Sequence, residues 1–207
     1  MTYLGYDVLE LDYDRQGPID LVHDRKFALL DAKTGKRIAD EQAEAPAPHR
    51  PFIWTAFGRA ETARMLQFLD DRKGRAVPFW FPSLQWDLSL AEDVSEEQSI
   101  ISVDWIRYRQ QFFGTTGARR HICFWRLGQG TSFDCYQVTD ATDPGDEATE
   151  SLTISPTAVS AYEKAVTVIS FLHFCRLDPD LTEVSYPSGN IAQATIHARE
   201  LPMEAPL

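Results

Sequence analysis

Short stretches in which apolar and polar side chains alternate recur along most of the chain. In one of them, Ile101, Val103 and Trp105 are separated by Ser102 and Asp104. A period of two residues puts successive side chains on opposite faces, which is typical of a strand with one buried face. Comparable stretches, bounded by turn residues, cover 6–13, 27–30, 121–125, 133–138, 152–154, 183–186 and 194–198. Such short, closely spaced strands predict antiparallel sheet.

Residues 166–174 form the most continuous apolar stretch of the chain. The run is rich in β-branched and aromatic residues and is too short to cross a membrane. It therefore predicts a central strand that is buried on both faces.

One segment follows the helical period instead. The apolar residues that recur at spacings of three and four, and so share one helix face, are Met65, Leu66, Phe68 and Leu69. Gly58 can begin this helix. The basic sequence R-K-G at 72–74 can end it, because cations suit the last turn and glycine readily takes the left-handed conformation. The sequence predicts one amphipathic helix over 58–74.

Together these elements predict a mainly β fold (α+β): an antiparallel β-sandwich or barrel-like sheet with one docked amphipathic helix. The chain has 207 residues, 43% of them hydrophobic, and we expect a single structural domain over 1–207. Residues 32–51 have no apolar period and contain E-A-P-A-P-H-R-P, so an extended loop or arm is expected there. The acidic residues 140–150 predict a solvated loop.

The helix is followed by an aromatic segment, 79–81, which is flanked by Pro78 and Pro82. Large rings on a stiff, extended segment must pack against something. Packing inside the fold's own core is the commoner outcome. The alternative is a contact with a neighbouring subunit, since tryptophan is enriched at interfaces. The candidates for such an interface are Arg72, Phe79, Trp80, Phe81 and Trp86.

Several of these segments also carry a family resemblance. The R-K-G ending at 72–74 is followed by P-F-W-F-P-S at 78–83 and then by Asp87. Residues 168–202 contain an apolar strand, alternating strands and an E-L-P ending, and 6–11 supply an opening strand. In this order the segments resemble tail-tip proteins of tailed bacteriophages, the distal-tail-like minor tail proteins.

The resemblance implies a structural protein of the virion, made in the host cytoplasm and located in the tail tip or baseplate. It implies self-association into a ring of threefold or sixfold order that joins the tail tube to the hub and receptor-binding apparatus. The expected partners are therefore copies of this chain, the tail tube protein, and hub or receptor-binding proteins. The resemblance includes no catalytic signature.

Charge and composition exclude several other classes. A formal net charge of -11 disfavours nonspecific binding to nucleic acid or to anionic membranes. No apolar run reaches the length of about 20 residues that a membrane-spanning helix needs, and the N-terminal sequence is acidic where a signal peptide would be basic. We expect neither nucleic-acid binding nor membrane insertion. Three cysteines are too few for a disulfide framework, so free buried thiols are expected.

The chain contains two H-x-C pairs, which are candidate metal ligands. Residues two apart on a strand share a face, so two neighbouring strands could offer four nitrogen and sulfur ligands to a tetrahedral zinc ion. Structural zinc sites usually use C-x-x-C turns, however, and the aromatic neighbours favour packed imidazoles and thiols. We expect no metal and no cofactor. The residues of this less favoured site are His121, Cys123, His173 and Cys175.

The sequence predicts a protein that is not an enzyme. It contains no nucleophile elbow, and a histidine and cysteine two residues apart on a strand are not an activated dyad. A glycoside hydrolase that uses Asp87 or Glu92 would require a particular separation of the two carboxylates. The alternative from another class is a carbohydrate-binding β-sandwich module that recognises host surface glycans. In it Trp80, Trp86 or Trp105 would stack on sugar rings.

Overall fold

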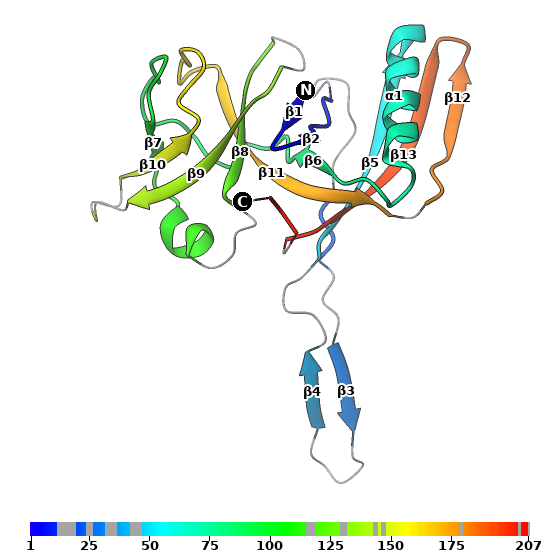
Figure 1. Cartoon of the computed structure of the whole chain (residues 1–207), viewed down its shortest axis with the longest axis horizontal. Coiled ribbons are helices and arrows are strands. Elements are labelled where there is room, and N and C mark those ends of the chain that lie inside the picture. Colours follow the sequence, from blue (N-terminus) through cyan, green and yellow to red (C-terminus); the bar gives the residue numbers. More distant parts are fainter. Residues whose placement is uncertain are drawn as a thin grey trace. The chain divides into compact units, whose positions relative to one another are not determined.

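Figure 1 shows the protein as a computed structural model of the whole chain. The structure describes residues 1–11, 20–23, 27–31, 37–41, 47–114, 119–128, 132–142, 145, 148–178, 180–202 and 204–206. The chain forms two compact units. Unit 1 comprises Met1–Gln16, Pro78–Cys175 and Glu204–Leu207, and unit 2 comprises Gly17–Val77 and Arg176–Met203. That these units make up a single domain remains a prediction.

The main sheet of unit 1 is antiparallel, with its strands in the order β11–β8–β9–β10–β7 (Figure 1). The bounds of these strands are β7 (Ile100–Asp104), β8 (His121–Arg126), β9 (Asp134–Thr142), β10 (Thr149–Ser155) and β11 (Thr167–Leu177). The last two residues of β11 belong to unit 2. β11 is buried at almost every position, as its continuous apolar sequence predicted.

One face of this sheet carries the apolar core of unit 1. Ile122 and Phe124 of β8 and Ile169 and Phe171 of β11 belong to it. They lie directly opposite one another across the β8–β11 ladder, Ile122 facing Phe171 and Phe124 facing Ile169, so the two strands bury the same face. A short π-helical turn, η2 (Arg109–Phe113), places two partly buried phenylalanines against this core.

The opposite face of the sheet is covered by the N-terminal segment and by an additional strand. β1 (Thr2–Tyr3) and β2 (Tyr6–Asp7) form a small antiparallel pair. β6 (Phe79–Pro82) pairs with β11. On this side Tyr3 and Trp80 contact the ring of His121, whose neighbour in sequence, Ile122, points into the core. Unit 1 is therefore layered, with the sheet between two sets of apolar side chains.

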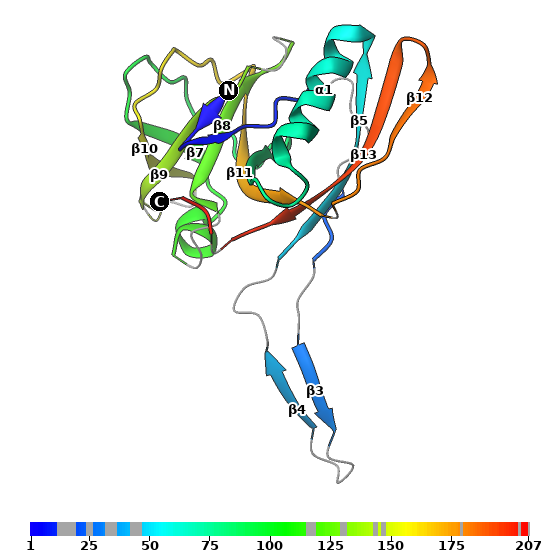
Figure 2. The same cartoon turned by 45° about the vertical axis from the view of Figure 1, so that its right-hand side comes forward.

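Unit 2 contains a sheet in the order β5–β13–β12, formed by β5 (His49–Phe57), β12 (Val184–Ser188) and β13 (Ile191–Glu200). The even-numbered residues of β5 and β13 are buried on one face. α1 (Gly58–Arg72) lies along β5 and β13 in both views (Figure 2). Met65 of α1 is fully buried, and the Phe68 ring lies 5.6 Å from the ring of Trp54.

The predicted arm over 32–51 contains regular structure. Within it, β4 (Arg37–Glu41) pairs with β3 (Phe27–Asp31) as a separate two-stranded sheet, and β5 already begins at His49. Residues 32–36 and 42–46 of the predicted arm lie outside the described residues. The strand β5 was not predicted because Pro48 precedes it and Pro51 lies within it, and prolines argue against a strand in the sequence.

The predicted fold class is confirmed: the protein is mainly β and antiparallel with one docked α-helix, and the described strands close no barrel. α1 begins at Gly58 as expected, but the left-handed residue that ends it is Lys73, followed by a left-handed Gly74. The expectation of a solvated loop over 140–150 was wrong at its ends. β9 extends to Thr142, and Glu150 is fully buried in β10. Among the described helices, none combines the length and the apolar character that crossing a bilayer requires.

Candidate assembly interface

The aromatic residues proposed for a subunit contact lie in the core of unit 1. Phe79, Trp80 and Phe81 have no exposed surface, because β6 pairs with β11 and the N-terminal segment covers it. The Trp80 indole N–H donates to the Tyr3 carbonyl at 2.9 Å. Its ring lies 4.9 Å from that of Phe174. Side chains with no exposed surface cannot contact a neighbouring subunit, so the core interpretation holds for these three residues.

Arg72 and Trp86, the other two candidates, differ from each other. Arg72 is buried, and its guanidinium lies 4.9 Å from the centre of the Phe68 ring. Its carbonyl accepts a hydrogen bond from Val77 N–H at 3.0 Å, so it secures the end of α1 and is not a surface charge. Trp86 is 52% exposed. Of the five predicted interface residues, Trp86 alone lies on the surface.

The four predicted metal ligands do not converge. Cys123 of β8 lies opposite Ser170 of β11. Directly opposite residues share a face, so His121 and Cys123 lie on the face of the even-numbered residues of β11. His173 and Cys175 are odd-numbered and lie on the other face. The zinc hypothesis is therefore wrong for these four residues. Among the described residues, no three or more histidine, cysteine, aspartate or glutamate side chains lie together in a way that could hold a metal ion.

The two carboxylates considered for glycoside hydrolysis, Asp87 and Glu92, have different surroundings, and one of them has a structural role. Asp87 accepts a hydrogen bond from Phe171 N–H at 2.7 Å and contacts the Ser83 hydroxyl. It therefore fixes the backbone after β6. Glu92 is exposed. Trp105, a proposed sugar platform, is half-buried, with the Arg107 guanidinium 5.0 Å from its ring.

A surface concavity lies in unit 2, between α1 and β12. It consists of two hollows that share Leu66. The first, of about 310 Å³, lies beside the start of α1 and is lined by Tyr186 of β12. The second, of about 390 Å³, lies beside the end of α1 and is lined by Leu181. We call the two hollows together the α1–β12 groove. Leu66, Tyr186 and Leu181 are 37%, 61% and 74% exposed, which is unusual for large apolar side chains in one place.

A second open surface lies at the other edge of the same sheet. Glu200 N–H donates to the Pro48 carbonyl and Gly58 N–H to that of Asn190. In this register the even-numbered residues of β5 exchange backbone hydrogen bonds with β13. The backbone N–H and C=O groups of the odd-numbered residues point away from β13. Residues 20–22 form backbone hydrogen bonds with β5 at His49 and Pro51.

Beyond Pro51, no described strand lies along this edge of β5. The two large apolar side chains on this stretch, Ile53 and Phe57, are 47% and 43% exposed. We call residues 53–57 the β5 edge. Within it, the Phe57 N–H donates to the Glu61 carboxylate at 2.7 Å. An edge strand with exposed apolar side chains is a template for contact with another chain.

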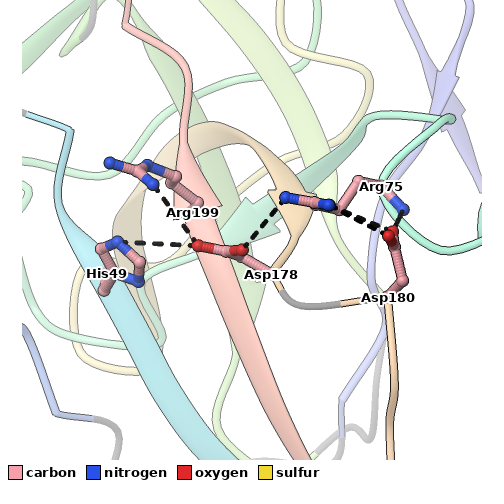
Figure 3. A network of polar contacts seen from close by, with 5 residues as sticks. All are labelled: His49, Arg75, Asp178, Asp180 and Arg199. Carbon is pink, nitrogen blue, oxygen red and sulfur yellow. Dashed lines mark hydrogen bonds and ion pairs between the residues drawn. The ribbon is translucent and has the colours of Figure 1, made fainter.

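A network of polar and charged side chains lies beside the second hollow of the groove (Figure 3). Asp178 approaches Arg199 at 3.5 Å, His49 at 3.8 Å and Arg75 at 4.0 Å. Asp180 accepts three hydrogen bonds from Arg75, one from its backbone N–H at 3.0 Å and two from its guanidinium at 3.1 and 3.0 Å. These bonds lower the pKa of Asp180, since they favour its charged form.

The structure explains why a glycine occupies position 74 in this turn. Its φ is +62°, and a Cβ at this position would lie 2.7 Å from Asp180 Oδ1. Glycine therefore permits both the left-handed backbone and the close approach of the carboxylate. The turn that carried the family resemblance fixes the segment after β11, which forms one wall of the groove.

Sequence reasoning missed both surfaces of unit 2. The first three residues of β5 were assigned to the arm and its remaining residues to no strand, and Leu66 was placed on the apolar stripe of α1. The available signal was the alternation of residues 49–57 directly before the helix. A scan against protein-family models and a search of curated proteins gave no match to this chain.

Proposed function

We propose that this chain is a structural, non-enzymatic protein of a phage tail tip. In this proposal it self-associates into a ring that joins the tail tube to the hub and the receptor-binding apparatus. The proposal combines the resemblance of segments 6–11, 72–87 and 168–202 to distal-tail-like proteins with the two open surfaces of unit 2. The subunit contact is assigned to unit 2, not to the aromatic segment of unit 1.

The observation that carries the proposal is the placement of these surfaces at opposite edges of one sheet. β5 and β12 flank β13, so the β5 edge and the α1–β12 groove face away from each other across that sheet. A contact between the β5 edge of one copy and the groove of the next is head-to-tail. Head-to-tail contacts produce closed rings when the rotation between copies closes.

The chemistry of the two surfaces suits this contact. The β5 edge offers Ile53 and Phe57, and the groove offers Leu66, Leu181 and Tyr186. Burial of exposed apolar side chains is the main driving force of association, and aromatic residues are enriched at interface centres. β12 is short and contains Pro187, which limits backbone pairing there. We therefore assign the side chains beside α1, not the β12 backbone, as the main receptor for the β5 edge.

The proposal is tested by counting this chain in purified particles. Peptide quantification should give a low, fixed copy number that matches a threefold or sixfold tail, calibrated against the abundant tube protein. The Leu66→Lys chain, expressed in place of the natural one, should be absent from particles, whereas the Val159→Lys chain should be incorporated normally. Val159 is the matched control because it is 55% exposed and lies in unit 1. A chain that is absent from particles, or present in variable amounts, would sink the proposal.

A sugar-binding module remains the alternative, and its case now depends on one side chain. Trp80 is buried and Trp105 is stacked beneath Arg107, so Trp86 is the tryptophan available as a platform. A single exposed ring offers less recognition than the coplanar rings that such modules use. Titration of host glycans against tryptophan fluorescence, with Trp86→Ala as the control, distinguishes this alternative.

A further inference from the structure

Two of the three cysteines face each other across neighbouring strands of unit 1. Cys123 of β8 is the direct partner of Cys135 of β9 in the antiparallel ladder. Both are buried free thiols, 0% and 7% exposed. The pairing could not be read from the H-x-C spacing, because it depends on the register of the ladder.

The hydrogen-bond pattern of the ladder determines how close the two side chains lie. Val138 N–H donates to the Arg120 carbonyl at 2.7 Å, so residues 120 and 138 form a hydrogen-bonded pair. Pair types alternate along an antiparallel ladder, and the third step from this pair is Cys123 with Cys135. The cysteines thus form a non-hydrogen-bonded pair, in which the Cα atoms are about 4.5 Å apart. Disulfides span Cα separations of about 4.4 to 6.8 Å.

The third cysteine cannot take part in the same bridge. Cys175 lies opposite Phe79 of β6. Ser170 is the residue of β11 that faces Cys123. Cys175 is five residues farther along β11, about 17 Å at the rise of a strand, and its odd number places it on the opposite face.

The N-terminal segment covers the cysteine pair. The Tyr3 hydroxyl lies 3.0 Å from His121 Nδ1, on the same face of β8 as Cys123. The Tyr3 carbonyl is held by the Trp80 indole, and the N-terminal amine pairs with Glu10 at 2.7 Å. Burial raises the pKa of the Tyr3 hydroxyl, and the Cys135 and Cys123 thiols raise it further. Access of an oxidant to Cys123, which has no exposed surface, therefore requires that the N-terminal segment open.

We propose that Cys123 and Cys135 are a redox site that forms a reversible cross-strand disulfide with a peroxide, under the control of the N-terminal segment. Burial raises the pKa of both thiols while the segment is closed. Once it opens, one thiol loses its proton and its thiolate attacks a peroxide oxygen; the O–O bond breaks, and with the released proton a sulfenic acid and one water form. The second thiol attacks the sulfenic sulfur, the S–S bond forms, and a second water leaves. The two sulfurs together lose two electrons, and hydrogen peroxide is reduced to two waters.

The bridge would join β8 to β9 without changing the fold, and it would be absent in a reducing compartment. It would stabilise unit 1 once the protein leaves such a compartment. This inference concerns unit 1 and does not depend on the assembly proposed for unit 2.

The test treats the full-length, folded chain with hydrogen peroxide, removes the peroxide with catalase, and alkylates the remaining thiols after unfolding. Non-reducing peptide mapping should show one bridge, Cys123–Cys135, and the count of free thiols should fall from three to one. Dithiothreitol should restore all of them. The oxidised form should keep its circular dichroism spectrum and melt about 5–10 °C higher, as expected for a short closed loop in a domain of this size.

Variants separate the pair from general oxidation. Cys175→Ser should form the same bridge, and Cys123→Ser or Cys135→Ser should form none. Tyr3→Ala should form it about tenfold faster, because local opening limits the reaction of buried groups. A bridge that includes Cys175, or one that forms only in urea, would overturn the inference. So would the failure of both the natural chain and Tyr3→Ala to form the bridge while folded.

Discussion

His121 shows how strongly the interior of unit 1 acts on one side chain. Its ring lies 4.6 Å from that of Trp80 and 5.7 Å from that of Tyr3. Burial lowers the pKa of His121 to about 4, since the charged imidazolium loses its hydration; a hydrogen bond to the Pro206 carbonyl acts in the opposite direction, and Arg120 adds a smaller lowering. The folded protein therefore holds this ring neutral.

This lowered pKa predicts a loss of stability in mild acid. An unfolded histidine takes up its proton near pH 6.5, whereas the folded one does so near pH 4. Between these values the unfolded state binds more protons, so the free energy of unfolding falls as the pH falls, by up to about 3 kcal/mol in total. It stays level above pH 6.5. Urea unfolding of the natural chain and of His121→Gln at pH 7, 5.5 and 4 measures the difference.

His121→Gln keeps a polar group beside Tyr3 but does not titrate. Its stability should decline less between pH 6.5 and pH 4, with only the carboxylates contributing to the slope. Equal slopes for the two proteins would show that His121 is not held neutral in the folded state.

At the scale of elements, Glu150 organises the segment that leads into η2. This buried side chain of β10 accepts hydrogen bonds from the backbone N–H groups of Ile106, Tyr108 and Arg109, at 2.9, 2.8 and 3.1 Å. Donors at the start of a helical turn have no partner within the turn. A carboxylate from a strand 41 to 44 residues away in sequence supplies it here.

Glu150→Ala should therefore destabilise unit 1 strongly. Three backbone donors would lose their acceptor, one in a buried and two in part-buried hydrogen bonds, and the expected cost is about 3–5 kcal/mol in the free energy of unfolding. Glu150→Gln keeps one acceptor oxygen and should cost less than half as much. Urea unfolding with far-ultraviolet circular dichroism measures both. A Glu150→Ala chain within about 0.5 kcal/mol of the natural one would contradict the role assigned to this carboxylate.

The elements that the sequence predicted well are those whose signal is local. The helical period marked α1 within two residues of its end, and the apolar run marked β11, since burial on both faces leaves its trace in composition. The buried position of Glu150 was not predicted, because a charged side chain normally indicates a solvent-exposed position. The three backbone N–H groups that donate to it come from a segment 41 to 44 residues away in sequence. The core position of Trp80 and the pairing of Cys123 with Cys135 depend on register between distant strands, which no local pattern contains.

At the scale of the whole molecule, the proposed function depends on how one copy contacts another. The candidate surfaces follow from the order β5–β13–β12, which leaves different surfaces at the two edges of one sheet. Two different surfaces make a head-to-tail contact, whereas a twofold dimer uses the same surface twice. The distinction can be tested in solution with purified protein.

Two variants each remove one surface. Ile53→Lys places a charge on the β5 edge, and Leu66→Lys places one where the two hollows of the groove meet. Each should leave the fold intact, because both positions are exposed, and should weaken the contact by at least about 2 kcal/mol, or roughly 30-fold. By light scattering, the natural chain should have the molar mass of a closed oligomer, and each variant alone should have the molar mass of a monomer. Val159→Lys should behave as the natural chain does.

An equimolar mixture of the two variants makes the geometry visible. The Ile53→Lys chain keeps its groove and the Leu66→Lys chain keeps its β5 edge, so one good contact can form between unlike copies. The mixture should therefore give a dimer and nothing larger, since the two remaining surfaces of that dimer are both damaged. If either variant dimerises alone, the contact is twofold and cannot propagate around a ring. If the mixture stays monomeric while the natural chain assembles, the β5 edge and the groove are not partners, and the ring must be held by other surfaces.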